Sequence, residues 1–278
     1  MRTREAIRHF FKRPLAVIGL VIVLIVIFVA IFAKQLAPYD PTKADFMAIL
    51  QPPNAEHLLG TDEIGRDLLS RIIYGARASL QAGIVAVLIA VGIGVPIGLL
   101  SGYFRGWVDE WVVMRVADAM IAFPTIVLAL ALSAVLGGGL LTAMMAIGIA
   151  NAPIFMRLAR GQALSIREHE YVEAARAVGS KNFKIMMQHV LPNMIGPILV
   201  QTSIAVAGAI LAETALSFLG LGVQPPTPSW GSMLRIGTTY MEQAIWLSIW
   251  PGMAIFITVL GINLLGDGLR DVLDPKDR

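Results

Sequence analysis

The chain has 278 residues, of which 56% are hydrophobic and only 15% are charged. Soluble domains carry about 25% charged residues, so this composition indicates an integral membrane protein. The formal net charge of +3 comes without a basic groove or a set of stacking aromatic residues, and we therefore expect no nucleic-acid partner. The chain has no cysteine, which excludes a disulfide framework and thiolate ligands for a metal ion.

A basic tail precedes the first apolar run. Its basic residues are Arg2, Arg4, Arg8, Lys12 and Arg13. The run from Leu15 to Ala33 is uncharged and long enough to cross about 30 Å of hydrocarbon at about 1.5 Å per residue. A signal peptide would have a shorter apolar core and a small-residue cleavage site, so we expect a retained span. Basic residues beside a span stay in the cytoplasm, which predicts a cytoplasmic tail.

Further spans follow from the spacing of charges and glycines. The stretch between Asp118 and Arg157 is uncharged and too long for one helix, and the glycines at 137–139 divide it into two spans. A later apolar run begins at Met194 and is interrupted only by Glu213. We therefore expect an all-α integral membrane fold with transmembrane helices over residues 15–37, 79–102, 118–136, 140–156, 194–219 and 244–266.

An even number of spans places both termini on the same side of the membrane. The segments expected in the cytoplasm are 1–14, 157–193 and 267–278, and those expected outside are 38–78 and 220–243. This arrangement puts most lysine and arginine residues inside, in agreement with the positive-inside bias. Because these segments are short, we expect a single transmembrane domain over residues 1–278.

The first external segment ends in a conspicuous polar stretch. Residues 60–80 read GTDEIGRDLLSRIIYGARASL, which predicts an amphipathic helix at the membrane surface before the second span. Asp62, Glu63 and Asp67 lie beside Arg66 in this stretch. We expect a solvated, self-paired cluster there and regard a metal site as the less favoured alternative.

Small residues recur every four positions through the second span. They are Ala78, Ala82, Ala86, Ala90, Gly94, Gly98 and Gly102. Small residues let helix backbones approach closely in lipid, so we interpret them as a packing face rather than as a pore lining.

Three polar residues on the spans are candidates for a translocation pathway. Glu213 is the most informative, because a carboxylate in a membrane helix is costly unless it faces a polar cavity or a partner. It either lines the pathway or pairs with another helix, and the sequence leaves both open. Gln201 and Asn263 are further candidates, although uncharged polar residues more often hydrogen-bond between helices.

The segment between the fourth and fifth spans contains a patterned polar stretch, which we call the elbow (residues 171–192). It reads YVEAARAVGSKNFKIMMQHVLP, and Tyr171, Val172, Ala174, Ala175 and Val178 fall at helical spacing on one apolar stripe. Gly179 is expected to end this helix, and Ser180 to cap a second short helix that ends before Pro192. Two helices that meet at a glycine on the membrane surface predict a docking site for another protein.

Motifs for catalysis and nucleotide binding are absent from the sequence. There is no G-x-x-x-x-G-K-[ST], because no lysine follows a glycine, and neither H-E-x-x-H nor G-x-S-x-G occurs. We therefore expect no enzymatic activity and no cofactor or metal in this chain.

The elbow resembles the cytoplasmic loop of bacterial ABC importer permeases, whose consensus is E-A-A-x3-G-x9-I-x-L-P. Glu173, Ala174, Ala175, Gly179, Leu191 and Pro192 match it, while His189 stands in place of the isoleucine. Blocks at 60–80, 216–231 and 263–275 are similar to the dipeptide, oligopeptide and nickel branch, within which they resemble the second permease subunit.

This resemblance implies a type I ABC importer permease fold in the inner membrane. It implies a homologous second permease, two ATP-binding subunits that hold ATP and Mg²⁺, and a periplasmic or lipid-anchored substrate-binding protein. The elbow residues, Ser180 included, would couple to the ATPase, and the loop around Trp230 would dock the binding protein. Peptides are the expected substrate, with nickel or other metal chelates and glutathione as alternatives. A secondary transporter without an ATPase and a membrane scaffold are the rival functions.

Overall fold

A computed structural model describes residues 10–273 of the chain. Within that range the structure is helical, and the terminal residues Arg2, Arg4, Arg8, Lys276 and Arg278 lie outside it. Five helices in the described part are long and apolar enough to cross a membrane, and a bent helix pair makes up to six. The elements are α2 (Pro14–Ile31), α3 (Ala33–Leu36), α4 (Leu68–Phe104), η1 (Asp109–Val113), α5 (Met114–Ile121), α6 (Thr125–Leu136), α7 (Leu140–Ile166), α8 (Glu170–Ala177), α9 (Asn182–Ile185), η2 (Met186–Val190), α10 (Leu191–Phe218), α11 (Trp230–Thr239) and α12 (Trp246–Leu273).

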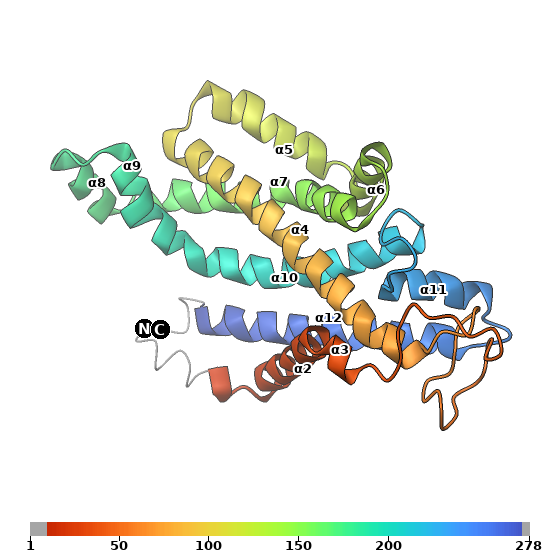
Figure 1. Cartoon of the computed structure of the whole chain (residues 1–278). Helices are drawn as coiled ribbons and strands as arrows, with labels where there is room; N and C mark the ends of the chain where they lie inside the picture. The colour runs from red at the N-terminus through yellow and green to blue at the C-terminus, as the bar shows by residue number, and fades with distance from the viewer. Residues whose placement is uncertain (1–9, 274–278) are drawn as a thin grey trace.

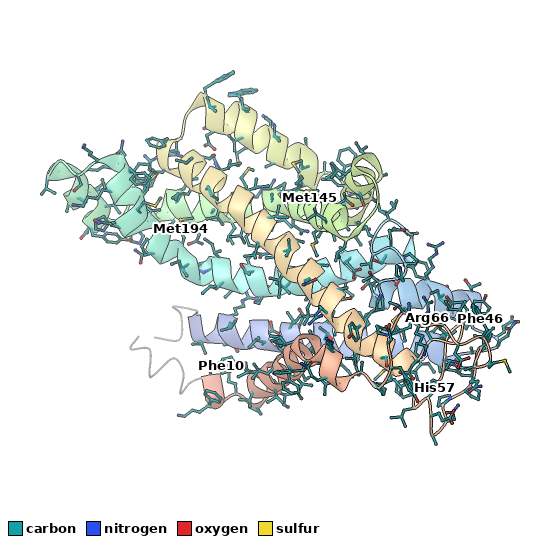
Figure 2. All side chains as sticks on the ribbon, in the orientation of Figure 1. Phe10, Phe46, His57, Arg66, Met145 and Met194 are labelled. Carbon is teal, nitrogen blue, oxygen red and sulfur yellow. The ribbon has the colours of Figure 1, made fainter. Side chains whose placement is uncertain are left out.

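The long helices connect two distinct ends of the molecule (Figure 1). One end carries α8, α9, the start of α2 and the last turns of α12. The opposite end carries α3, α11 and the long connection (residues 38–67), on which Phe46, His57 and Arg66 are labelled in Figure 2. Helix α4 runs diagonally between the two ends and packs against α7, α10 and α2.

The crossing of α4 and α7 is a direct contact between helix backbones. A Cβ atom added at Gly94 would lie 2.5 Å from the Ala152 carbonyl oxygen, and one at Gly98 would lie 2.2 Å from that of Met156. A Cβ at Gly102 would lie 2.5 Å from the Arg160 carbonyl oxygen. These distances confirm that the small residues of α4 form a packing face.

Helix α4 is longer than the expected span and absorbs most of the predicted amphipathic helix. Residues 60–67 are irregular, and the helix then continues without a break from Leu68 to Phe104. Asp67 fixes the start, because its carboxylate accepts a hydrogen bond from the Ser70 amide at 2.8 Å. The expectation of a separate surface helix over 60–80 was therefore wrong.

The expected span over residues 118–136 is not a straight helix. Helices α5 and α6 meet at an angle of 98°. Pro124 occupies the N-cap position of α6 with an extended ψ of 127°, and proline has no N–H to continue the preceding helix. Other helices extend beyond the expected ranges, since α7 reaches Ile166 and α12 reaches Leu273. The loop expected outside the membrane, residues 220–243, contains α11, which the sequence pattern did not predict.

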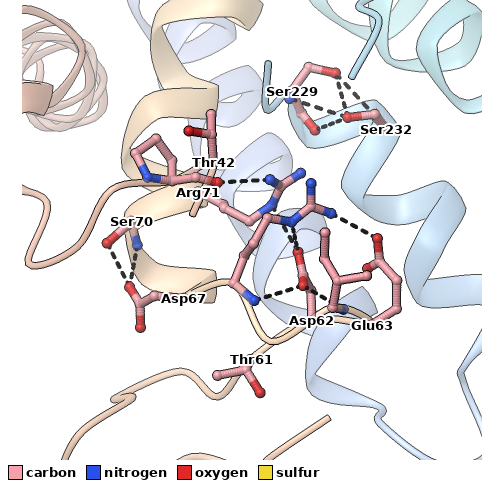
Figure 3. A network of polar contacts seen from close by, with 12 residues as sticks. Thr42, Thr61, Asp62, Glu63, Asp67, Ser70, Arg71, Ser229 and Ser232 are labelled. Carbon is pink, nitrogen blue, oxygen red and sulfur yellow. Dashed lines mark hydrogen bonds and ion pairs between the residues drawn. The ribbon is translucent and has the colours of Figure 1, made fainter. Parts of the chain in front are cut away.

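The long connection is held by a buried network of charges (Figure 3). Arg66 Nε donates to Asp62 Oδ2 at 2.6 Å, and Arg66 Nη2 donates to Glu63 Oε1 at 2.8 Å. From the first turn of α4, Arg71 donates to the Pro41 carbonyl oxygen at 2.9 Å and lies 3.3 Å from Asp62. Asp62 and Arg66 are 2% and 6% exposed, so the cluster is self-paired but not solvated as expected. Burial, reinforced by the charge of Asp62, raises the pKa of the Glu63 carboxyl.

We predict that Gly98→Ala lowers the stability of the protein, because its Cβ would overlap the backbone of α7. Overpacking of this kind costs about 1–3 kcal/mol, which a thermal unfolding scan in detergent would detect. Gly92→Ala is the matched control on the same helix, since nothing lies within 4 Å of its Cβ position. Equal stability of the two variants would contradict a packing role for Gly98.

Candidate functional site

The turn at Gly179 closes helix α8 with a Schellman motif. The Gly179 amide donates to the Arg176 carbonyl at 2.9 Å, and the Ser180 amide donates to the Ala175 carbonyl at 3.1 Å. Gly179 has a φ of +79°, a left-handed conformation that L-residues other than glycine and asparagine rarely adopt. The helix therefore ends where the sequence pattern placed its end.

Ser180 does not cap the second helix of the elbow. The N-cap of α9 is Lys181, and no side-chain hydrogen bond caps that helix. The next helix therefore begins one residue later than the sequence pattern predicted, while the Ser180 amide closes α8. The capping role expected for Ser180 was wrong, while its backbone stabilises the turn.

The C-terminal arm of the elbow continues directly into a long helix. Residues Asn182–Phe218 form one candidate span, which includes α9, η2 and α10. The π-helical turn η2 directly precedes Leu191 and Pro192. Proline lacks an N–H and its ring clashes with the carbonyl four residues earlier, so a widened turn relieves the conflict at this point. A displacement of the elbow would therefore pass into α10 without an intervening loop.

One face of the elbow packs on the core, and the other is exposed. Val172 is fully buried and Ala175 is partly buried against the same hydrophobic cluster. Glu173 and Ala174 are exposed, and Val178 is 82% exposed. The predicted apolar stripe is thus divided between the two faces. Figure 1 shows α8 and α9 projecting at one end of the molecule, so the exposed face is open to a partner.

Glu213 occupies a helix contact rather than an open cavity. Its carboxylate is fully buried and accepts hydrogen bonds from Ser217 Oγ at 2.6 Å and from Ser79 Oγ at 3.3 Å. Ser79 belongs to α4, so the carboxylate joins α10 to α4. Of the two interpretations that the sequence left open, this geometry favours the structural pair.

Gln201 and Asn263 do not converge with Glu213 on one surface. Asn263 is exposed and lines a groove of about 490 Å³ between α10, α11 and α12, together with Thr214 and other residues. Gln201 is half-buried on α10 and does not line this groove. Their pathway role stays a prediction, and Asn263 is the better placed of the two.

Trp230 is part of the packed interior rather than of a docking surface. Only 2% of its surface is exposed, and its indole Nε1 donates to the Ile72 carbonyl oxygen of α4 at 3.0 Å. It begins α11, whose capping box pairs Ser229 with Ser232. The expectation that Trp230 itself meets a binding protein was wrong, because a buried indole that is already hydrogen-bonded cannot contact one.

Charged side chains near the elbow pair with one another across helices. Residues 10–273 contain no group of three or more His, Cys, Asp or Glu side chains placed to hold a metal ion. The charged contacts at the elbow end join α7 to the segment after α4, where Arg160 makes two hydrogen bonds of 2.7 Å to Asp109. These contacts fix the helices that lead into the elbow.

Known proteins share both the sequence and the fold of this chain. The family described as binding-protein-dependent transport system inner membrane component matches residues 94–278, and the N-terminal TM domain of oligopeptide transport permease C matches residues 2–53. The dipeptide transport system permease protein DppC of Alkalihalophilus pseudofirmus is 46% identical, covering 98% of this chain and 90% of that protein. The protein of the same name from Escherichia coli strain K12 is 50% identical, covering 96% and 91%.

A solved structure supports the same fold. The MetNI methionine ABC transporter in an inward-facing conformation aligns with a TM-score of 0.61 at 18% identity, covering 73% of this chain and 96% of that chain. Apolar helices that cross the bilayer around a projecting helical elbow define an integral membrane permease. The chain belongs to the family of binding-protein-dependent transport system inner membrane components.

Family membership establishes the class of function. The chain is the multi-pass inner-membrane permease subunit of an ABC importer, in the type I permease fold expected from the sequence. The family consists of transport proteins and not enzymes. Membership also argues against the rival functions of a secondary transporter and a membrane scaffold.

We predict that Glu213→Gln retains uptake, because the amide oxygen can accept from the Ser217 hydroxyl while the amide N–H donates to the Ser79 oxygen. Glu213→Leu should instead lower stability by about 1–3 kcal/mol, because both hydroxyls lose their acceptor. Thermal unfolding and substrate uptake would be measured on the same preparations. A Gln variant that unfolds normally but does not transport would assign Glu213 to the translocation pathway.

Proposed function

We propose that this permease forms half of a translocation pathway for peptides, with di- and oligopeptides as the main substrates. The proposal rests on the similar proteins, which are named as dipeptide or di/tripeptide permeases. They are 44–50% identical to this chain over nearly its whole length. Nickel or other metal chelates and glutathione are the alternative substrates of the same branch, and they serve as outcomes of the uptake test below.

The proposed partners are a homologous second permease, two ATP-binding subunits and a periplasmic or lipid-anchored binding protein. ATP and Mg²⁺ would be bound by the ATP-binding subunits. The exposed face of the elbow supports an ATPase dock, because Glu173 and Ala174 lie beside Val178 on a surface that the rest of the described chain does not cover. The small Ala174 side chain allows close approach, and Leu191 and Pro192 connect the dock to α10.

The proposed orientation places the elbow and both termini in the cytoplasm. The start of α2 and the end of α12 lie at the same end as the elbow, and Arg13 pairs with Asp271 there. The long connection and α11 would then face outward. The binding protein would dock on these external elements, at exposed positions around residues 224–227 rather than at Trp230.

The proposed mechanism is alternating access driven through the elbow. ATP binding would close the two ATP-binding subunits and move the paired elbows, which would change the spans from inward-facing to outward-facing. A partner drives such a switch only by binding one state more tightly than the other. Because the elbow continues into α10 as one helix, α10 would move with it.

We predict that the chain co-purifies in mild detergent with a second permease and ATP-binding subunits, and that its loss abolishes uptake of labelled dipeptides. Uptake would be compared in cells with and without the subunit, using a nickel chelate and glutathione as alternative substrates. Unchanged dipeptide uptake with lost chelate or glutathione uptake would contradict the peptide proposal. A chain that purifies without ATP-binding subunits would contradict the proposed assembly.

We predict that Gly179→Pro abolishes ATP-driven uptake while membrane insertion is retained. Proline can neither adopt a φ of +79° nor donate the hydrogen bond that the Gly179 amide makes to Arg176. Gly179→Asn is the control at the same position, because asparagine tolerates a left-handed conformation and should retain most of the uptake. Normal uptake by the Pro variant would show that the turn has no coupling role.

A further inference from the structure

Tyr103 connects the end of α4 to the elbow through three separate contacts. It is the penultimate residue of α4 and is 4% exposed. Its hydroxyl donates to Asn182 Oδ1 at 3.0 Å, and the Arg176 guanidinium carbon lies 5.4 Å from the centre of its ring. Its backbone carbonyl accepts a hydrogen bond from Arg167 Nη1 at 2.8 Å.

The three partners of Tyr103 lie before, within and after the first helix of the elbow. Arg167 is the C-cap of α7, Arg176 lies in the last turn of α8, and Asn182 is the first residue of α9. One side chain on α4 therefore touches both helices that meet at Gly179. A rotation or shift of these helices would have to move Tyr103 or break its contacts.

The ring and the hydroxyl of Tyr103 have different roles, because the ring packs in the core and the hydroxyl bonds Asn182. The ring of Tyr103 is buried in the hydrophobic core cluster that also contains Val172 and Ile185, and a phenylalanine would fill the same space. Asn182 is exposed, so its side chain can bond water when the tyrosine hydroxyl is removed. The hydroxyl is therefore dispensable for packing, while it is the group that fixes Asn182 to α4.

We propose that Tyr103 is a positioning residue that transmits the displacement of the elbow to α4. This inference rests on the proposed role of the elbow as the ATPase dock. Helix α4 runs from Tyr103 to the opposite end of the molecule, where Arg71 holds the long connection through the Pro41 carbonyl oxygen. The elbow thus acts on two spans, through the continuous helix into α10 and through Tyr103 into α4.

The test uses the assembled transporter in proteoliposomes with its binding protein and a dipeptide, and measures peptide taken up per ATP hydrolysed. Tyr103→Phe should leave assembly and ATP hydrolysis unchanged, lower the unfolding temperature by no more than about 2–4 °C, and lower this ratio about fivefold, the factor for one ordinary hydrogen bond. Asn182→Ala should do the same, and the double variant should be no worse than either single variant. Tyr74→Phe makes the same chemical change nearer the start of α4 and should behave as the unsubstituted protein.

Three results would overturn the inference. An unchanged ratio in Tyr103→Phe would show that the hydroxyl transmits nothing, and additive losses in the double variant would show that the two residues act separately. A loss of unfolding temperature that accounts for the loss of uptake would make Tyr103 a packing residue only. If Gly179→Pro is impaired while Tyr103→Phe is normal, only this inference fails. Normal coupling in both variants would remove the elbow proposal itself.

Discussion

The approach of α4 to α7 along Gly94, Gly98 and Gly102 is the contact on which the other features depend. Apolar side chains gain little by leaving lipid for a helix contact, so membrane helices are held by close packing of backbones and by hydrogen bonds. Here the missing Cβ atoms bring α4 against the carbonyl oxygens of α7. Helix α7 leads into the elbow, and α4 ends beside it. The position of the exposed elbow surface therefore depends on glycines that pack against α7, at a distance from the elbow itself.

Toward the end of the molecule opposite the elbow, hydrogen bonds join α4 to α10 and to α11. Glu213 joins α10 to Ser79 of α4, and Trp230 joins α11 to the backbone of α4. Helix α10 is continuous with the elbow, and Tyr103 of α4 contacts the elbow. Because Glu213 joins α10 back to α4, the elbow, α4 and α10 are each connected to the other two. A displacement of the elbow would then act on both helices, which the Glu213 carboxylate joins through Ser79.

The sequence allowed the spans, the glycine turn and the family to be predicted, because each has a local signal. Charge-free runs mark membrane helices. A glycine after a helical pattern marks a helix end, because glycine readily adopts the left-handed conformation that the turn requires. The missed features depend on contacts between distant residues. The order of the long connection comes from Arg71 and Asp62, and the burial of Trp230 comes from its packing on α4. Pro124 marked a helix end in the sequence, but the 98° angle between the two helices that meet there could not be read from it. The role of Tyr103 gave no signal, since one tyrosine at a helix end is unremarkable in a sequence.

The widened turn η2 has a consequence for how this protein can vary. A π-helical turn corresponds to one additional residue in an α-helix, and one residue rotates an α-helix by about 100°. The turn lies between α9 and α10, so it sets the rotational register of the elbow about the axis of the span that follows. Deleting a single residue there would leave the span in lipid and the residues of α8 and α9 unchanged, yet these two helices would point in a different direction. If the elbow docks an ATPase as proposed, compatibility with it would be gained or lost through one insertion or deletion in η2, without any change in the exposed residues of α8.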